Sequence, residues 1–296
     1  MYYQAIDFIG YSHIQHLVPK FSPFNKAIAS IIISACRVST SKKYDYGNKF
    51  NREAMKNTTI HLPITTSGEI DFEFMESFIA ELEAERIAEL EAYLLATGLT
   101  DYILTAEEKA VLQAFRDSKR GGVDLVDYQL FSIMKLFGKS TRGKRLKSAD
   151  RIEGTLPFVT AGEANEGVSA FVGNDVEVFS KNTITIDMFG SAKYRNYDYG
   201  GDDHIAVVHT ENLPKLASVF VTAAIHKSSY TGKFDYGHNF YAKDADELNI
   251  FLPALNGKPD YALMETLISA VQKVVIKDVV QYANRKIAAI KEVALK

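Results

Sequence analysis

The densest group of charged residues lies between Lys135 and Arg151, where seven lysines and arginines accompany one acid, Asp150, for a local charge of +6. Lysine and arginine side chains neutralise phosphate groups, so such a run can bind a nucleic-acid backbone. The alternative is a solvated surface loop, which has a similar composition. Because the whole chain carries a formal charge of −3, a nucleic-acid partner has to be met by a local patch of this kind.

A second group of reactive side chains is Asp202-Asp203-His204, followed by His209. Carboxylates and imidazoles are metal ligands, but this spacing matches no standard ligand pattern. The alternative is a hydrogen-bonded loop leading into a strand at residues 205–208. The second interpretation is favoured, and the sequence predicts no metal site.

Motifs for catalysis are missing from the sequence. It contains no Gly-x-Ser-x-Gly and no phosphate-binding loop. A methyltransferase would carry a glycine-rich cofactor loop and an Asn/Asp-Pro-Pro-aromatic motif, and neither occurs. The sequence therefore predicts a protein that is not an enzyme and binds no cofactor of its own.

The composition is that of an ordinary globular protein, with 47% hydrophobic residues in 296. The single cysteine, Cys36, lies in an apolar run and excludes a disulfide within one chain. The N-terminus lacks the features of a signal peptide, and no apolar run reaches the roughly 18 residues of a membrane span. We expect a cytoplasmic protein.

The sequence contains a duplication that includes the segments expected to position the charged groups described above. Residues 43–50 recur as residues 233–240, in Lys-aromatic-Asp-Tyr-Gly followed three residues later by Phe. The similarity continues from Ile60-His61-Leu62-Pro63 to Ile250-Phe251-Leu252-Pro253, and backwards from His13-Ile14 to His204-Ile205. A repeat of this length indicates duplicated domains rather than a solenoid. Residues 124–192 have no counterpart in the first copy, which is therefore expected to be truncated.

Long helices are predicted after each copy. From Asp71, which is predicted as the N-cap, apolar residues recur at helical spacing up to Gly98, which is a stop signal. A further helix is expected from Ala106 to Ser118, ended by Gly121-Gly122. The helix from Asp260 is apolar enough to need a partner, and its duplicate from residue 71 is the obvious one. The alternative is that each helix lies on its own domain.

The remaining segments read mainly as strands and loops. Residues 1–65 suggest strands and loops, although residues 27–36 fit either a helix or a buried strand. In the second copy, strands are expected at residues 126–131, 156–160, 167–173, 176–186 and 205–208. Loops at 162–167 and 190–196 mix small, basic and aromatic residues, which suits contact with base edges and phosphates.

The second copy resembles a known family. The residues that carry the resemblance are Pro157-Phe158-Val159-Thr160-Ala161-Gly162-Glu163 with Asn165, Gly167, Val168 and Ser169, then the run from Thr183 to Tyr194, then Gly200-Gly201-Asp202-Asp203-His204. They resemble a target recognition domain of restriction–modification specificity subunits, of type I systems and related type IIB and IIG enzymes. The resemblance extends over essentially the whole chain, including the Ile-x-Leu-Pro and Met-Glu entry into each long helix.

The resemblance implies an α+β fold with duplicated target recognition domains, the first truncated, joined by long helices that pack as an antiparallel two-helix coiled coil. The expected domains are a truncated recognition domain (1–68), a first spacer helix region (69–122), a complete recognition domain (123–257) and a second spacer helix (258–296). Each domain of such a subunit reads one half of a split DNA site, and the helices fix the distance between the halves.

The candidate DNA-binding residues are expected in the second copy. For phosphate contact they are Arg142, Lys144, Arg145 and Lys193; for base readout they are Thr160, Asn165, Tyr194, Arg195, Lys227 and Ser228. The counterparts in the first copy are weaker, because Gln4 stands where Arg195 is and the basic run is missing. The helices implied to dock other subunits offer Met75, Ile79, Leu82, Met264, Ile268, Val271 and Val275.

The expected partners are double-stranded DNA, methyltransferase subunits, and a restriction subunit or a second copy of the chain, in a bacterial or archaeal cytoplasm. S-adenosylmethionine and Mg are implied only for partner subunits. The truncated copy suggests a natural fragment, a split-gene product completed by another chain, or a protein that dimerises. The rival hypothesis is a decayed specificity subunit that acts as a structural or protein-interaction module through its helices.

Overall fold

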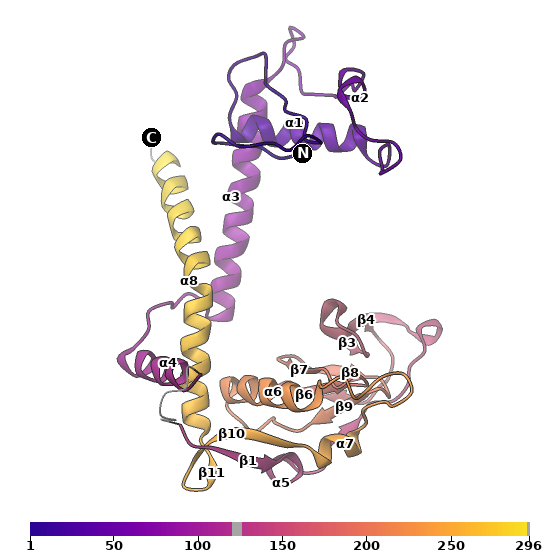
Figure 1. Cartoon of the computed structure of the whole chain (residues 1–296), viewed down its shortest axis with the longest axis vertical. Helices are drawn as coiled ribbons and strands as arrows, with labels where there is room; N and C mark the ends of the chain where they lie inside the picture. The colour runs from indigo at the N-terminus through magenta and orange to yellow at the C-terminus, as the bar shows by residue number, and fades with distance from the viewer. Residues whose placement is uncertain (120–125, 295–296) are drawn as a thin grey trace. The chain divides into compact units, whose positions relative to one another are not determined.

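A computed structural model of the chain describes residues 1–119 and 126–294 (Figure 1). The chain forms two compact units by its internal contacts. Unit 1 consists of Met1–Thr100 and Val279–Lys296, and unit 2 of Asp101–Asp278. The predicted domain boundaries at residues 68 and 257 stay predictions, and the boundary at residue 122 and the helix stop at Gly121-Gly122 lie outside the described residues.

Unit 2 combines helices with antiparallel and mixed sheets, as the predicted α+β class requires. Its helices are α4 (Ala106–Lys119), α5 (Ile133–Phe137), η1 (Ser148–Asp150), α6 (Lys215–Ser229), α7 (Ala242–Glu247) and the first part of α8 (Tyr261–Ala294), with a helical turn, η2, at Ala164–Gly167. Its strands are β1 (Tyr128–Ser132), β2 (Thr141–Arg142), β3 (Glu153–Val159), β4 (Val168–Val172), β5 (Val178–Phe179), β6 (Thr183–Asp187), β7 (Ala192–Arg195), β8 (Tyr199–Gly201), β9 (Ile205–Val208), β10 (Asn249–Leu255) and β11 (Lys258–Pro259). They are hydrogen-bonded in the orders β1-β10-β11, β2-β9-β6-β7 and β4-β3-β8-β5.

The sheet β2-β9-β6-β7 lies between two hydrophobic cores. Alternate residues of a strand point to opposite faces, so in β9 Ala206 and Val208 join one core while Ile205 and Val207 join the other. Val221 and Ile225 of α6 cover the first face. The second face packs against residues of the sheet β4-β3-β8-β5, including Tyr199. Every residue of β6 and β9 is buried, which explains their continuous apolar and threonine sequences.

Most of the strands expected in unit 2 are confirmed. The segments predicted at 126–131, 156–160, 167–173 and 205–208 correspond to β1, β3, β4 and β9. The segment 176–186 is two strands, β5 and β6, because the chain turns before Asn182, whose φ of 64° lies in the left-handed region.

Unit 1 contains α1 (Lys26–Thr40), α2 (Arg52–Lys56) and α3 (Phe72–Thr97). The predicted caps of α3 are confirmed: the Asp71 side chain accepts from Phe74 N–H at 2.8 Å, and Gly98 adopts φ 70°. The ambiguous segment at 27–36 is helical. The expectation of strands in residues 1–65 is wrong, since the only β-structure described there is an isolated bridge between Ile64 and Ile70.

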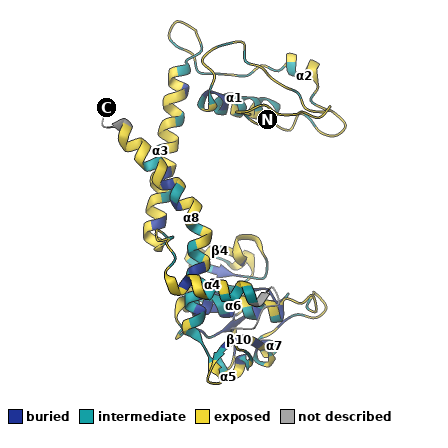
Figure 2. Ribbon diagram, turned by 60° about the vertical axis from the view of Figure 1, so that its left-hand side comes forward, coloured by how far each residue is buried: buried dark blue, intermediate teal, exposed yellow. Residues whose placement is uncertain are grey.

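The long helix α8 has two kinds of neighbour along its length. Its first turns belong to unit 2, where Met264 is fully buried in the core and Leu267 and Ala270 pack against Leu112 of α4. From Val279 it belongs to unit 1, where it runs beside α3 in the opposite direction, as Figures 1 and 2 show. An ion pair of 2.9 Å joins Lys286 Nζ to Glu83 Oε2 of α3. The predicted antiparallel pairing therefore holds for the later part of α8, and its beginning lies on its own domain.

Burial differs between the two units. Figure 2 shows dark blue residues in the sheets of unit 2 and yellow, exposed residues along much of α3 and the N-terminal loops. Within the described residues, no helix combines the length and the apolar character needed to span a bilayer.

Candidate nucleic-acid interface

The basic run is held at one edge of the central sheet of unit 2. Thr141 and Arg142 form β2, which pairs with β9, and the Lys144 N–H donates to the Gly201 carbonyl at 3.0 Å. Gly143 allows this close approach, because a Cβ there would lie 1.9 Å from the Gly201 oxygen. A backbone anchored in this way presents the cations of the run from a fixed edge rather than from a free loop.

The side chains of the run are mostly free to meet phosphates. Arg142, Lys144 and Arg145 are exposed, and Lys144 Nζ has only a 3.9 Å contact with the exposed carboxylate of Glu177. Arg151 differs, because its guanidinium stacks on the Phe158 ring at 5.2 Å. The phosphate-binding candidates are therefore the residues around β2.

The loop at 160–167 is closed by its own backbone and is well exposed at its tip. The Thr160 N–H donates to the Gly167 carbonyl at 2.8 Å. Asn165 and Glu166 adopt φ of 48° and 55°, and both side chains are exposed. Asparagine tolerates the left-handed region but glutamate does so at a cost, and such conformations persist only where the surroundings impose them. The loop thus presents Asn165 and Glu166 in one defined conformation.

Asp187 connects this loop to the turn between β6 and β7. Its Oδ1 accepts from Phe189 N–H and Ser191 N–H, each at 3.0 Å, and its Oδ2 lies 3.4 Å from the Gly162 nitrogen. The same Oδ2 lies 3.7 Å from Lys193 Nζ. The carboxylate therefore fixes the turn at 187–192 and the loop at 160–167 relative to each other.

Lys193 lies inside this arrangement rather than on the surface. Its Nζ contacts Glu163 Oε1 at 3.2 Å and Ser191 Oγ at 2.9 Å, and its side chain is 14% exposed. A hydrogen bond from Ser191, followed by the Lys193 ammonium, lowers the pKa of the Glu163 carboxyl despite partial burial. With two carboxylates beside it, Lys193 is a positioning residue for the loop and a poor phosphate ligand.

The end of α6 lies on the other side of the same turn. The Ser229 hydroxyl donates to the Gly190 carbonyl at 2.6 Å, and Ala192 N–H donates to His226 Nδ1 at 3.2 Å. Next to these contacts, Lys227 is exposed and Ser228 is half-buried. The turn at 187–192 therefore brings together two segments that are distant in sequence, with Thr160 and Asn165 on one and Lys227 and Ser228 on the other.

Two of the predicted readout residues are placed elsewhere. Arg195 is 1% exposed, with Nε donating to Thr185 Oγ1 at 2.9 Å and Nη1 to the Tyr197 hydroxyl at 3.0 Å. The Tyr194 hydroxyl donates to Asn182 at 3.0 Å, and partial burial raises its pKa. The prediction of base contact by Arg195 is corrected here, because no base edge can reach a guanidinium enclosed between two layers of the domain.

A tyrosine in the repeated motif, Tyr236, lies beside the turn at 187–192 and was not among the predicted site residues. The Asp235 side chain accepts from Gly237 N–H and His238 N–H at 2.7 and 2.9 Å, and the turn that it braces leaves Tyr236 86% exposed. The Tyr236 ring lies edge-on to Phe189 at 5.2 Å, beside the turn at 187–192. In the first copy Asp45 braces the same turn and Tyr46 is 92% exposed. The signal was present in the sequence: the aspartate, tyrosine and glycine recur in both copies.

The acidic group at Asp202-Asp203-His204 lies close to the basic run. His204 Nδ1 is 3.2 Å from Asp203 Oδ1 and 3.9 Å from Asp202 Oδ2. Among the described residues, this is the one group whose potential metal-ligand atoms lie within 4.8 Å of one another. All three side chains are partly buried, and Asp202 Oδ1 and Asp203 Oδ1 are buried without a hydrogen-bond partner among the described residues. The expectation of a hydrogen-bonded loop without a metal stays a prediction.

The residues proposed for subunit docking fall into three sets, according to how far they are exposed. Met75 and Met264 are fully buried within their own units and cannot meet a partner. Ile79 and Ile268 are half-buried. Leu82, Val271 and Val275 are 39%, 38% and 72% exposed, so these are the proposed docking residues with the most surface available to another subunit.

Comparison with known proteins places the chain in a family. The sequence profile described as type I restriction modification DNA specificity domain matches residues 1–92 and 125–291. The chain is 23% identical over 242 residues to the type II restriction enzyme BgcI specificity subunit S.BcgI of Heyndrickxia coagulans, a match that covers 80% of this chain and 65% of that protein.

Solved structures with some similarity come from restriction–modification systems. The S subunit of M. genitalium is 16% identical with a TM-score of 0.44, covering 80% of this chain and 64% of that one. The HsdS subunit of Thermoanaerobacter tengcongensis is 15% identical with a TM-score of 0.35, covering 86% and 62%. The chain thus spans less than two thirds of the length of these relatives. Because the family profile matches both copies and most of the sequence, the chain belongs to the type I restriction modification DNA specificity domain family.

Proposed function

We propose that the chain is the DNA-recognition subunit of a restriction–modification complex and reads its target mainly through unit 2. The observation that carries this proposal is the fixed surface around the turn at 187–192, where the loop at 160–167, the end of α6 and the Tyr236 turn meet. Readout of bases needs side chains held in defined positions, and this turn holds three segments together.

Affinity and specificity come from different residues in this proposal. Arg142, Lys144 and Arg145 contact phosphates, which positions the domain without reading sequence. Asn165, Lys227 and Ser228 contact base edges. An asparagine can make a bidentate contact with adenine, worth about 1–3 kcal/mol of discrimination. Glu166, exposed beside Asn165, is a further candidate because a carboxylate accepts from the cytosine amino group.

The helices are the proposed contact with methyltransferase subunits. Val271 and Val275 on α8 and Leu82 on α3 expose apolar surface for this purpose. S-adenosylmethionine, Mg and the catalytic groups would belong to the methyltransferase and restriction subunits, in the cytoplasm of a bacterium or archaeon. A second copy of the chain is a further proposed partner, since one complete recognition domain reads only one half of a split site.

A double charge reversal tests the DNA-binding surface. Lys144→Glu with Arg145→Glu is expected to weaken duplex binding by about tenfold or more at low salt, because two phosphate contacts become repulsions. The matched control is Lys258→Glu on β11, an exposed lysine of the same unit outside the proposed surface. Fluorescence anisotropy with random-sequence duplex measures both. Equal binding by the double variant and the control would remove this run from the interface.

Methylome sequencing tests the proposed role in modification. A host expressing the chain with a cognate methyltransferase subunit is compared with a host expressing the methyltransferase alone. We expect a new methylated motif only when the chain is present, and Asn165→Asp should change or abolish that motif while Lys258→Glu leaves it unchanged. Absence of a new motif would contradict the proposed recognition role.

A further inference from the structure

The turn at 187–192 meets the end of α6 through two hydrogen bonds of different kinds. The Ser229 hydroxyl donates to the Gly190 carbonyl at 2.6 Å, and the Ala192 N–H donates to His226 Nδ1 at 3.2 Å. At the first contact the two backbones approach closely, because a Cβ on Gly190 would lie 2.5 Å from the Ser229 carbonyl oxygen. The second contact is made by a histidine, whose charge changes near neutral pH, so the two contacts respond differently to acid.

The direction of the second hydrogen bond fixes the state of the imidazole. A backbone N–H can only donate, so Nδ1 of His226 is the unprotonated nitrogen and the proton of the neutral ring is on Nε2. A second proton can enter only at Nδ1, the atom that already accepts from Ala192. Protonation therefore turns this acceptor into a donor and places two N–H groups against each other. The contact is made by neutral His226 and is lost when the ring is charged.

Ala192 stands between two residues that hold the loop at 160–167. Lys193 Nζ lies 2.9 Å from Ser191 Oγ and 3.2 Å from Glu163 Oε1 in that loop. The side chains on either side of Ala192 thus meet the loop together. A contact that fixes the backbone of Ala192 therefore also fixes the place at which the loop is attached.

A charged imidazole would be attracted to other neighbours. The pKa of Glu163 is lowered first by a hydrogen bond from Ser191 and, less strongly, by the charge of His226. The His226 ring also lies 4.9 Å from the Tyr230 ring, tilted by 31°, and an aromatic face attracts a cation. The other charged side chains on the segments around this end of α6 are Asp187, Lys193, Lys227 and Asp235. Strand β10, which also packs on α6, contains no charged residue. A charged ring thus gains two attractions that do not involve the backbone contact.

We propose that His226 is a positioning residue for base readout and that it holds the turn at 187–192 only in its neutral form. The inference rests on the proposed function, because this turn aligns the two segments that carry the candidate base contacts. One is the loop at 160–167, with Asn165, and the other is the end of α6, with Lys227 and Ser228.

Protonation of the imidazole releases one side of the turn. The turn stays attached to α6 through Gly190 and Ser229, whereas Ser191 and Lys193 move with Ala192 and take the loop with them. Base contacts need side chains on both sides of the turn in defined positions, so discrimination between DNA sequences falls. The phosphate contacts proposed around β2 do not use this turn, so binding to DNA of any sequence persists.

The first measurement needs no DNA. Backbone amide exchange of the full chain is followed at residues 189–192 at about pH 7.5 and about pH 5.5, because histidine side chains change charge between about pH 5 and 8. The rates are corrected for the intrinsic effect of pH on exchange. In the wild type, we expect protection of the Ala192 amide to fall about tenfold or more at the lower pH. In His226→Asn the side-chain oxygen can accept in place of Nδ1 and does not titrate, so protection should be equal at both pH values.

The second measurement follows readout. Anisotropy titrations compare a duplex carrying the motif found by methylome sequencing with a random-sequence duplex, at the same two pH values. The wild type should lose about tenfold of its preference for the motif at the lower pH, and His226→Asn should keep its preference. His226→Leu has no acceptor and should lack the preference at both pH values. Its binding to the random-sequence duplex reports whether the fold and the phosphate-binding surface are intact.

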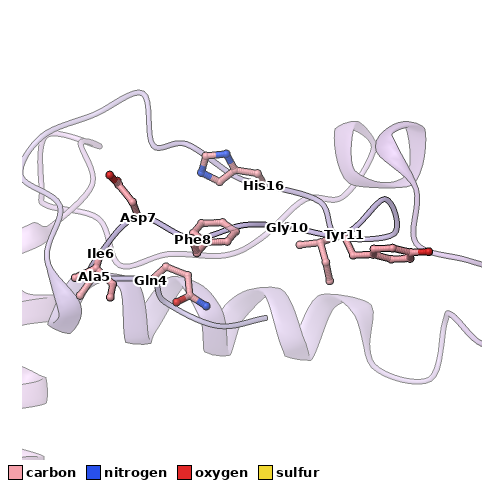
Figure 3. Close-up of a pocket in the computed structure, with 9 residues that line it drawn as sticks. Gln4, Ala5, Ile6, Asp7, Phe8, Gly10, Tyr11 and His16 are labelled. Carbon is pink, nitrogen blue, oxygen red and sulfur yellow. The ribbon is translucent and has the colours of Figure 1, made fainter.

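His16→Asn is the matched control for the loss of a histidine. His16 is exposed in unit 1, where it lines a hollow with Phe8 and Tyr11 (Figure 3). Its ring lies edge-on to the Phe8 ring at 5.4 Å. Because His16 belongs to unit 1 and the turn at 187–192 to unit 2, this variant should show the pH dependence of the wild type in both measurements.

Three results would overturn the proposal. The first is protection of the Ala192 amide that is the same at both pH values in the wild type. The second is a His226→Asn protein that keeps the pH dependence of the wild type. The third is an undiminished preference for the motif in His226→Leu. A chain that directs no methylated motif would contradict the proposed function, and the amide measurement would still decide whether neutral His226 holds the turn.

Discussion

Arg195 shows how burial changes the role of a residue that looks suited to DNA. Its guanidinium donates to Thr185 and Tyr197 and lies 5.9 Å from the centre of the Tyr199 ring, inside the domain. A planar donor group with several fixed partners ties neighbouring strands together. The residue is therefore expected to matter for stability and not for the choice of bases.

Replacing Arg195 tests this role directly. Arg195→Lys keeps the charge but loses the fork of donors, and should lower the free energy of unfolding by about 2 kcal/mol. Chemical denaturation followed by circular dichroism measures this change. Arg145→Lys is the exposed control and should stay within about 0.5 kcal/mol of wild type. An Arg195→Lys protein of unchanged stability would contradict the structural role.

Tyr236 is the opposite case, because its aromatic side chain is largely exposed to solvent. Because its side chain is 86% exposed, Tyr236→Phe should leave stability within about 0.5 kcal/mol of wild type. The hydroxyl is a suitable donor to a phosphate, so we expect the same change to weaken duplex binding about fivefold. Anisotropy titrations measure the affinity. The control is Tyr93→Phe on α3, and an equal effect of both changes would argue against a contact at Tyr236.

At the scale of elements, α4 is attached to α8 by a buried carboxylate. Glu108 is 6% exposed and accepts from the Thr105 N–H at 2.8 Å, Ser269 Oγ at 2.6 Å and Lys273 Nζ at 3.1 Å. Lys273 also contacts Asp101 at 2.8 Å. Glu108 thus caps its own helix and orients a lysine of the next one, so α4 is fixed on α8 by specific contacts as well as by Leu112.

The attachment of α4 should depend on pH. Burial by itself would raise the pKa of Glu108, but hydrogen bonds from Ser269, Thr105 and Lys273 outweigh it and hold the pKa below its ordinary value of 4.5. Because the pKa of Glu108 is lower in the folded state than in the unfolded state, the ionised carboxylate stabilises the fold fully at pH values above the unfolded-state pKa. This stabilisation is lost as the pH falls through the folded-state pKa. We expect Glu108→Gln to lower stability by about 1–3 kcal/mol near pH 7, and by less below about pH 4.

Denaturation at both pH values, with Glu107→Gln as the matched control on the same helix, measures this effect. Glu107 is exposed and should show little difference from wild type. If Glu108→Gln lowered the free energy of unfolding equally at pH 7 and below pH 4, ionisation of Glu108 would contribute nothing to the attachment of α4.

At the scale of the whole molecule, the chain carries a net negative charge, as DNA does, and this repulsion opposes binding. The chain has a formal charge of −3, so attraction depends on the few cations around β2. With the three proposed phosphate contacts, the affinity should fall about 40-fold between 50 and 200 mM salt. Anisotropy titrations over this range measure the slope of log affinity against log salt concentration. The double variant Lys144→Ala with Arg145→Ala should reduce the magnitude of this slope by about two. A slope near zero in the wild type would contradict phosphate contacts.

The sequence was sufficient for elements that depend on neighbouring residues. The Asp71 cap, the Gly98 stop and the helix from Ala106 were predicted and confirmed, because caps and helical periodicity act over a few residues. It was insufficient for side chains whose surroundings come from distant segments. Nothing local distinguishes Arg195, which is buried, from Arg145, which is exposed.

The repeat and the family resemblance by themselves determined that the chain contains two related units and that each leads into a long helix. Only the tertiary structure decided what each unit becomes. Residues 14–17 and 205–208 have corresponding sequences, yet only the second is a strand, because β9 lies between β2 and β6 while residues 14–17 have no such neighbours among the described residues. A helix closes its hydrogen bonds within itself, whereas a strand closes them on a partner, so strands in this protein are decided by what lies beside them.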